Sequence, residues 1–207
     1  MPKHFPYFHK ALRYYYPDEA TVLINSLHST YTALKPDISF AKKSSNPLDK
    51  RMDIAASFLV LAKVLDEKGA GFEKIREISL FIATDYVQPK TWLGARMKRW
   101  PVKFIRTRLG AMLTQYLKKK VAKAAHPDGF AADLITDKAA TFGLGYGVDI
   151  TECGICKLFE KHHYKKYSSI LCEVDHITTS LAGLEMVRTG TIANGAKICD
   201  FRYKLKP

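Results

Sequence analysis

The spacing of the apolar residues changes near residue 128, and this change limits the folds that the 207-residue chain can adopt. Before it, apolar residues recur every three or four positions, which is the period of a helix with one buried face. After the turn-forming sequence HPDG at 126–129, segments appear in which they recur at every second position, which is the period of a strand. We therefore expect a helical region over 1–127 and an α+β region over 128–207, together forming one integrated domain.

Four helices are expected in the first region, each with one apolar stripe that faces the protein interior. Their ranges are 17–34, 47–68, 72–86 and 91–125, with a loop at 36–50 and a break in the last helix at Trp100-Pro101. Gly69 is expected to cap the second helix. The stripes contain Val22, Leu23 and Leu27 in the first helix, Ile82 and Tyr86 in the third, and Val102, Ile105, Leu109, Met112, Leu113 and Tyr116 in the last. Lys118 to Lys120 lie off the last stripe and are expected to face solvent.

The second region is expected to form an antiparallel sheet with helices on one side. Alternating apolar residues predict strands at 130–136, 141–151, 184–192 and 198–205, and helical spacing predicts helices at 153–164 and 168–179. Asn194-Gly195 is a hairpin signal between the last two strands, and counting outward from it places Cys199 opposite Gly190. The fold class is therefore α+β, with a helical N-terminal half packed on a C-terminal antiparallel sheet of about four strands.

The formal net charge of +13 is concentrated between residues 90 and 123, where eleven Lys and Arg residues occur without any Asp or Glu. An amphipathic basic helix can be a scaffold helix with a solvated basic face, or it can lie on an anionic membrane surface. Trp92 and Trp100 flank the basic cluster, so residues 91–123 are a candidate surface for binding an anionic membrane. No nucleic-acid partner is predicted.

Bulk features of the chain favour a cytoplasmic location. No apolar run reaches the roughly 18 residues that a membrane span needs, and the first residues lack the apolar core of a secretory signal. Four cysteines in 207 residues are too few for a disulfide scaffold, so we expect reduced thiols. Reduced thiols can be core residues, metal ligands or nucleophiles, and composition alone does not choose among these roles.

All four cysteines lie in the second region, next to other residues that can carry chemistry. Cys153 and Cys156 open a predicted helix, where unpaired backbone N–H groups stabilise a thiolate. Cys172, Asp175 and His176 share one face of the following helix. A thiol beside a carboxylate and an imidazole suits an activated nucleophile or a metal site, while a buried Cys172 with a solvated His176 explains the same spacing.

Arg188 lies in a predicted strand that is otherwise fit to be half buried. An inward-pointing arginine needs a partner, which can be Asp175, Asp200 or the carboxylate of a ligand. The hairpin register also places Arg188 one diagonal step from Cys199 on the same face. A cation at that distance is expected to lower the pKa of the Cys199 thiol, whereas simple burial would raise it.

Three separated blocks of this region together resemble the L-2-amino-thiazoline-4-carboxylic acid hydrolase family. They are DITEC at 149–153, CEVD at 172–175 and RTGTIANGAKICDFR at 188–202. The three blocks in this order are far more specific than any one of them. The resemblance implies a hydrolase without an organic cofactor, which opens a thiazoline or related small heterocycle carrying a carboxylate and gives a carbamoyl-cysteine.

The resemblance and the chemistry of the side chains together indicate the candidate site residues. The candidate catalytic residues are Cys172, Cys199, Asp175 and Cys153. The candidate substrate-binding residues are Arg188, Asp149, His176 and Asp200. Arg188 would hold the substrate carboxylate, because a guanidinium binds a carboxylate through two N–H groups. No metal ligand is assigned, and a homodimer is compatible with the assignment.

Two other functions remain open. The ending GAKICDF at 195–201 has a weaker likeness to small-molecule-binding domains related to 4-vinyl reductase. This likeness favours a non-enzymatic module that binds a small molecule or a metal. The third function is that of a basic membrane-associated protein, for which salt-sensitive retention on anionic surfaces is expected.

Overall fold

The computed structural model describes residues 2–206 and confirms the expected α+β class. The α-helices in this range are α1 (Phe5–Tyr15), α2 (Ala20–Leu34), α3 (Met52–Glu67), α4 (Phe72–Val87), α5 (Trp92–Ile105), α6 (Arg108–Val121), α7 (Gly154–Lys161) and α8 (Ser168–Leu181). The strands are β1 (Ala131–Ile135), β2 (Gly147–Glu152), β3 (Leu184–Val187) and β4 (Cys199–Leu205). Short 3-10 helices connect them: η1 (Lys35–Lys42), η2 (Pro47–Arg51), η3 (Ala139–Thr141), η4 (Lys165–Tyr167) and η5 (Ile192–Asn194).

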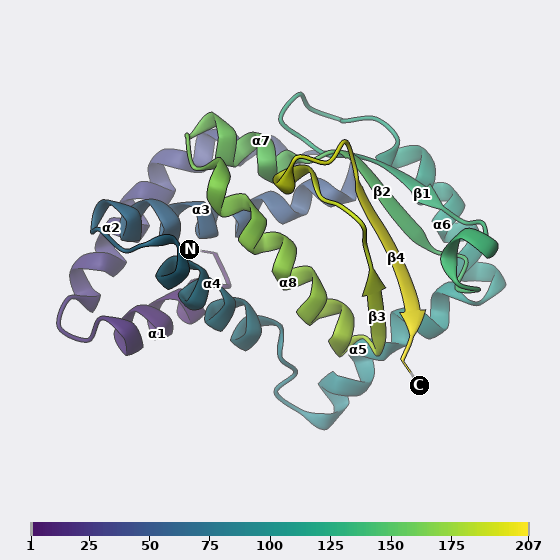
Figure 1. Cartoon of the computed structure of the whole chain (residues 1–207), viewed down its shortest axis with the longest axis horizontal. Helices are drawn as coiled ribbons and strands as arrows, with labels where there is room; N and C mark the ends of the chain where they lie inside the picture. Colours follow the sequence, from purple (N-terminus) through teal and green to yellow (C-terminus); the bar gives the residue numbers. More distant parts are fainter. Residues whose placement is uncertain (1, 207) are drawn as a thin grey trace.

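The four strands form one sheet in the order β1-β2-β4-β3, and all neighbouring pairs are antiparallel. The helices α1 to α4 gather beside this sheet, and α8 lies between them and the strands (Figure 1). α8 packs on α4 through one side and on β3 through another. The helical half is therefore packed on the sheet as expected.

Helix α3 is the centre of the helical half. Eleven of its sixteen residues are buried, because α2, α4 and α7 all pack against it. Its sequence is correspondingly apolar on nearly every side. Gly69 ends this helix as expected: it has a positive φ of 86°, and the next amide, Ala70 N–H, donates to the Leu65 carbonyl at 2.9 Å.

One residue of the expected stripe of α2 and one of the expected stripe of α4 are exposed instead of buried. Leu23 and Leu27 of α2 are buried, but the side chain of Val22 is 67% exposed. Consecutive helical residues point about 100° apart, so Val22 and Leu23 cannot both face α3. Tyr86 in the last turn of α4 is also exposed, and its ring contacts the edge of α1 at Tyr7 with centroids 5.3 Å apart.

Helical structure also occurs where none was expected. Helix α1 buries Phe5, Phe8 and Leu12, whose spacing of three and four residues is a helical signal within an aromatic-rich segment. The expected loop at 36–50 contains η1 and η2. Asn46 begins η2, because its side-chain oxygen accepts the Leu48 N–H at 3.0 Å.

The basic segment breaks between α5 and α6, and not at Trp100-Pro101 as expected. Pro101 lies inside α5. The chain changes direction at Thr107, whose side-chain oxygen accepts the Gly110 N–H at 3.1 Å and so caps α6. Gly110 is required at this crossing, because a Cβ there would lie 2.1 Å from the Phe104 carbonyl oxygen.

The apolar stripe of α6 faces solvent, which contradicts the expectation that it faces the protein. Leu109, Met112, Leu113 and Tyr116 are all exposed. The residues of α6 that are buried are Gly110, Thr114 and Val121, because α6 packs on β1 through this other side. No helix within residues 2–206, α5 and α6 included, is long and apolar enough to cross a membrane.

Lys118 to Lys120 are exposed at the end of α6, as expected. Replacing all three with glutamine is expected to change the free energy of unfolding by less than about 1 kcal/mol, because the side chains are exposed and Lys120 contacts only the exposed ring of Tyr116, at 4.8 Å. Chemical denaturation of the triple variant and the parent checks this. A fall in stability of several kcal/mol would mean that these lysines do hold α6 in place.

The strand expected at 141–151 is only half as long. Residues 147–152 form β2, while 141–146 form a loop with positive φ angles at Phe142, Gly143 and Gly145. Left-handed residues cannot continue an extended strand. Of the three glycines in the expected strand, at 143, 145 and 147, only Gly147 has another segment packed closely against its backbone. A Cβ at Gly147 would lie 3.0 Å from the Phe201 carbonyl oxygen.

The last two strands keep the expected register but are shorter at their joined ends. β3 pairs with β4 so that Leu184 faces Leu205 and Val187 faces Arg202, which is the register counted from Asn194-Gly195. β3 then stops, because the carboxylate of Asp200 accepts the backbone N–H of Thr189 at 3.0 Å. η5 fills the space that the two-residue hairpin was expected to occupy.

Candidate functional site

The sheet separates the predicted site residues between its two faces. Side chains alternate along β4, so Cys199 and Phe201 share one face while Asp200 and Arg202 share the other. Cys199 and Phe201 are buried in the main core. Asp149 of β2 lies directly opposite Asp200 and belongs to the second face.

Asp149 and Asp200 are both held by neighbouring residues of the second face. Asp149 accepts two hydrogen bonds from Arg202, at 2.6 and 3.1 Å, in a bidentate ion pair. Asp200 is partly buried, which alone would raise its pKa, but hydrogen bonds from Thr189 and the Gly190 N–H prevail and lower it. The structure thus does not bring these two carboxylates together with Cys172 and Arg188.

The first face carries the other predicted residues around Arg188, whose side chain is only 9% exposed. One of its terminal nitrogens donates to the Cys172 carbonyl oxygen at 3.2 Å, and the other lies 3.5 Å from an oxygen of Asp175. The guanidinium also lies over the Phe201 ring, 5.1 Å from its centre. Arg188 therefore connects the Cys172 to Asp175 turn of α8 with β4.

Three residues that sequence reasoning missed complete this cluster. Arg51, at the end of η2, places a guanidinium nitrogen 3.9 Å from Asp175, and its side chain is 53% exposed. Tyr146 and Tyr203 stack with ring centroids 5.9 Å apart. Burial raises the pKa of Tyr203, and the charge of Asp175 raises it further, which places this ring beside the cluster. The alternation from Cys199 onward could have placed Tyr203 on this face. Arg51 carries no such signal, because it comes from the helical half.

Asp175 has a raised pKa. Burial raises it, and the nearby charges of Arg51, Arg188 and His176 only partly offset this effect. Its side chain nevertheless keeps 26% of its surface exposed, so the carboxylate is recessed and still reachable. His176 itself is exposed on α8 and makes no hydrogen bond with the cluster. A reachable carboxylate with a raised pKa is suited to exchanging protons with a bound molecule.

The two thiols nearest Arg188 are not activated. Burial raises the pKa of Cys172 to about 12, with a further increase from the charge of Asp175. Burial also raises the pKa of Cys199 to about 11, although the Ile192 N–H donates to its sulfur at 3.2 Å. Arg188 acts in the expected direction on both thiols, but its effect is smaller than that of burial.

Cys153 and Cys156 form a second pair of thiols beside the first. Cys153 is the N-cap residue of α7 and Cys156 is buried in its first turn. The interaction with Cys156 raises the pKa of Cys153, and burial raises it further. The same interaction lowers the pKa of Cys156 and outweighs burial, which acts in the opposite direction. Cys156, although it is buried, is therefore the thiol of this pair whose anion is stabilised.

Labelling with iodoacetamide is expected to leave Cys172 and Cys199 unmodified in the folded protein at about pH 8.5, where unperturbed thiols react. Labelling of Cys199 should increase only as the pH approaches about 11. Because the unfolded chain loses this proton first, the stabilisation from the neutral thiol is lost as the pH rises from about 9 to about 11. Mass spectrometry of peptides from folded and urea-unfolded protein measures this, and rapid labelling of folded Cys199 at about pH 8.5 would contradict it.

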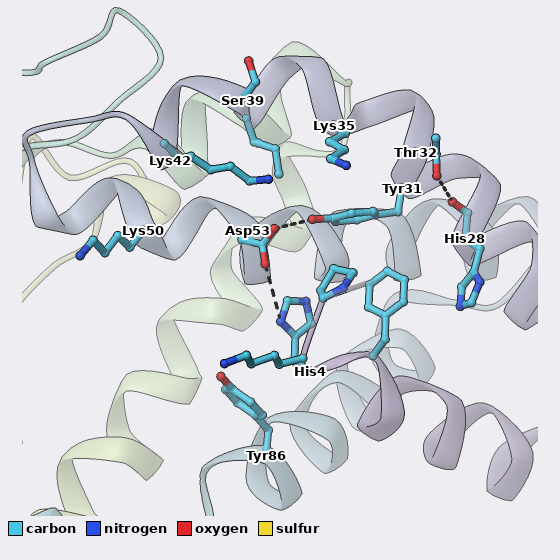
Figure 2. A pocket seen from close by; sticks show the side chains of 15 residues that line it. His4, His28, Tyr31, Thr32, Lys35, Ser39, Lys42, Lys50, Asp53 and Tyr86 are labelled. Atoms are coloured by element: carbon cyan, nitrogen blue, oxygen red, sulfur yellow. Dashed lines mark hydrogen bonds and ion pairs between the residues drawn. The ribbon is translucent and has the colours of Figure 1, made fainter.

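Within residues 2–206, no group of three or more His, Cys, Asp or Glu side chains is placed so that it could hold a metal ion. A cavity of about 700 Å³ does occur, but in the helical half, away from the cysteines. Figure 2 shows Asp53 in this cavity, hydrogen-bonded to Tyr31 and near His4, with Lys35 and Lys42 extending above them. This cavity and the cluster around Arg188 are thus separate features of the molecule.

Comparison with known proteins adds to this geometry. No curated protein and no solved structure gave a significant match. Residues 87–203, which run from the end of α4 into β4, match the family described as L-2-amino-thiazoline-4-carboxylic acid hydrolase. This range is more than half of the chain, and it includes α8, the whole sheet except the last residues of β4, and every candidate site residue except Arg51. The chain therefore belongs to the L-2-amino-thiazoline-4-carboxylic acid hydrolase family.

Proposed function

We propose that this protein is a hydrolase that opens a thiazoline or related small heterocycle bearing a carboxylate. Family membership supports a hydrolase-like function in general terms. The observation that carries the finer proposal is the recessed Asp175, which has a raised pKa and lies between the guanidinium groups of Arg51 and Arg188. This arrangement offers a proton acceptor next to two cations.

The two arginines would bind the carboxylate of the substrate. A guanidinium has five N–H donors, and Arg188 uses only part of them on Cys172 and Asp175. The exposed side chain of Arg51 can turn toward an incoming anion. Two cations around a single carboxylate leave a net positive charge, which favours an anionic substrate.

Asp175 would act as the general base. It takes a proton from water while the water oxygen bonds to the ring carbon between nitrogen and sulfur, and it passes that proton to the ring nitrogen. The tetrahedral centre then collapses, the ring C–S bond breaks, and the remaining hydroxyl proton goes to the departing sulfur. One water is consumed and the product is a carbamoyl amino acid with a free thiol. The raised pKa values of Cys172 and Cys199 favour this route over attack by a thiolate.

Incubation with 2-amino-thiazoline-4-carboxylate tests the proposal. We expect one new thiol per ring opened, detected with a chromogenic disulfide, and a product whose mass is that of the substrate plus one water. The same ring without its carboxylate is the matched control, and we expect it to react with a much higher KM because Arg51 and Arg188 have no anion to bind. Binding of the carboxylate substrate without ring opening would favour a non-enzymatic binding module and overturn the proposed reaction.

A further inference from the structure

Helices α5 and α6 carry large apolar side chains that no other part of residues 2–206 covers. Thirteen large apolar side chains are exposed in this range, and eight belong to these two helices: Trp92, Leu93, Met97, Trp100, Leu109, Met112, Leu113 and Tyr116. On α5, Leu93, Met97 and Trp100 are four and three residues apart. On α6, Leu109, Met112 and Tyr116 are three and four residues apart. Each helix therefore has an uncovered apolar stripe.

The stripes are not used to attach the helices to the protein. α6 packs on β1 and on the end of α5 through Gly110, Thr114 and Val121. α5 buries Val102 in a small cluster with Leu144 and Leu184. Since these contacts lie on other sides of the helices, the stripes form an apolar surface available to a partner.

The same segment is strongly cationic. Residues 91–123 contain ten Lys and Arg residues and no Asp or Glu. None of the ten forms an ion pair with a carboxylate among residues 2–206. Three of them, Lys118 to Lys120, lie together in the last turn of α6. The charge of this surface therefore calls for an anionic partner.

We propose that α5 and α6 bind the surface of an anionic lipid bilayer. Amphipathic helices with Lys and Arg on one side and Trp and Leu on the other lie in the plane of the interface, with the apolar side between the acyl chains and the headgroups. Trp92 and Trp100 suit this depth, because their rings have an apolar body and a polar N–H. Binding in this plane requires no helix that crosses the membrane.

Charge and side-chain type argue against two other occupants of the stripes. A second copy of this chain would bring the same ten cations to the contact, and the two sets would repel each other. A nucleic acid would suit the cations and could stack on Trp92 or Trp100. It would leave the aliphatic side chains of Leu109, Met112 and Leu113 without a partner, whereas acyl chains cover them.

Tryptophan fluorescence of the full chain reports on this binding directly. The chain has only two tryptophans, both in α5, with side chains 75% and 62% exposed. Adding phosphatidylcholine vesicles that contain phosphatidylglycerol is expected to shift the emission to shorter wavelengths. Bromine-labelled acyl chains in the same vesicles should quench it. Vesicles of phosphatidylcholine alone are expected to cause little change, because the cations then have no anionic lipid to bind.

Matched variants separate the charge from the apolar stripe. Replacing Lys118, Lys119 and Lys120 with glutamine is expected to lower the partition coefficient for anionic vesicles roughly a hundredfold. Replacing Leu109 and Leu113 with serine should lower it at least about tenfold. The control for charge is glutamine at Lys35, Lys42 and Lys43, and the control for apolar loss is Val22→Ser. Both controls should bind as tightly as the parent protein.

Several results would overturn the proposal. One is equal binding of the parent protein to neutral and anionic vesicles. Another is a fall in the partition coefficient of the control variants as large as that of the α6 variants. A third is the absence of a blue shift in tryptophan emission at low salt. Tight binding of an oligonucleotide without vesicle binding would assign the surface to nucleic acid, and dimerisation through the stripes would assign it to a second copy. Ring opening measured without vesicles should be unchanged in the serine and glutamine variants, so this test is independent of the proposed reaction.

Discussion

Replacing Asp175 with asparagine is expected to lower kcat for ring opening by about 10²- to 10⁴-fold, because the amide cannot accept the proton of the attacking water. The fold should not suffer. Burial raises the pKa of Asp175, which means that the ionised carboxylate is costly at this position, so Tm is expected to stay the same or to rise. Steady-state kinetics and thermal unfolding of the same preparation check both expectations.

The matched control lies on the same helix. Glu173 of α8 is ion-paired with Arg76 at 2.5 Å, away from Arg188, so Glu173→Gln should keep kcat. In the parent protein, kcat/KM should fall as the pH is lowered through the pKa of Asp175, which lies above the ordinary 3.8, because the base must be unprotonated. Full activity of Asp175→Asn, together with loss of activity in Cys172→Ala or Cys199→Ala, would transfer the proposed role to a thiol.

Replacing Asp49 with alanine is expected to lower the free energy of unfolding by about 2–4 kcal/mol. Asp49 is fully buried, and its carboxylate accepts the Phe130 N–H at 2.9 Å and the Ser44 hydroxyl. The substitution would leave a buried backbone N–H without a partner at the start of β1. For a chain of this length, Tm should fall by roughly 4–16 °C.

Asn46 also binds the backbone of Phe130, and it allows a second test of this connection between the helical half and the sheet. Its side-chain nitrogen donates to the Phe130 carbonyl oxygen at 2.7 Å, so Asn46→Ala should also destabilise the protein. Asp133→Ala is the control, because Asp133 is exposed in the middle of β1. Calorimetry of the three variants measures the link between the helical half and the sheet. Unchanged Tm for Asp49→Ala would mean that other contacts hold the two regions together.

Much of the fold followed from local patterns in the sequence. The change of apolar period near residue 128 predicted the helical half and the sheet, and Gly69 predicted the end of α3. The Asn194-Gly195 turn predicted the register of β3 and β4, although Asp200 shortens the ladder by binding Thr189. The spacing of Cys172 and Asp175, and that of Arg188 and Cys199, could also be predicted, because one helical turn determines the first and one hairpin the second.

Other features depended on what packs against each element. Alternation along β4 places Cys199 and Asp200 on opposite faces of the sheet, but it does not show which face the helices cover. The pairing of β2 with β4, which places Asp149 opposite Asp200, also comes from the structure. Helical spacing likewise gave α6 an apolar stripe, and the structure packs the opposite, small-residue side on β1. A periodic pattern divides an element into sides, whereas contacts with distant segments decide which side is buried.

The pKa values and charged neighbours of the site residues also depended on contacts with distant segments. The sequence alone determined the residue types, and the spacing that brings a cation near Cys199. Only the tertiary structure placed Arg51 beside Asp175, from a segment more than 120 residues earlier in the chain. It also enclosed the thiols so far that burial outweighs the charge of Arg188 and raises their pKa values. The pKa of a group depends on all the atoms around it, and most of those atoms belong to segments that are distant in sequence.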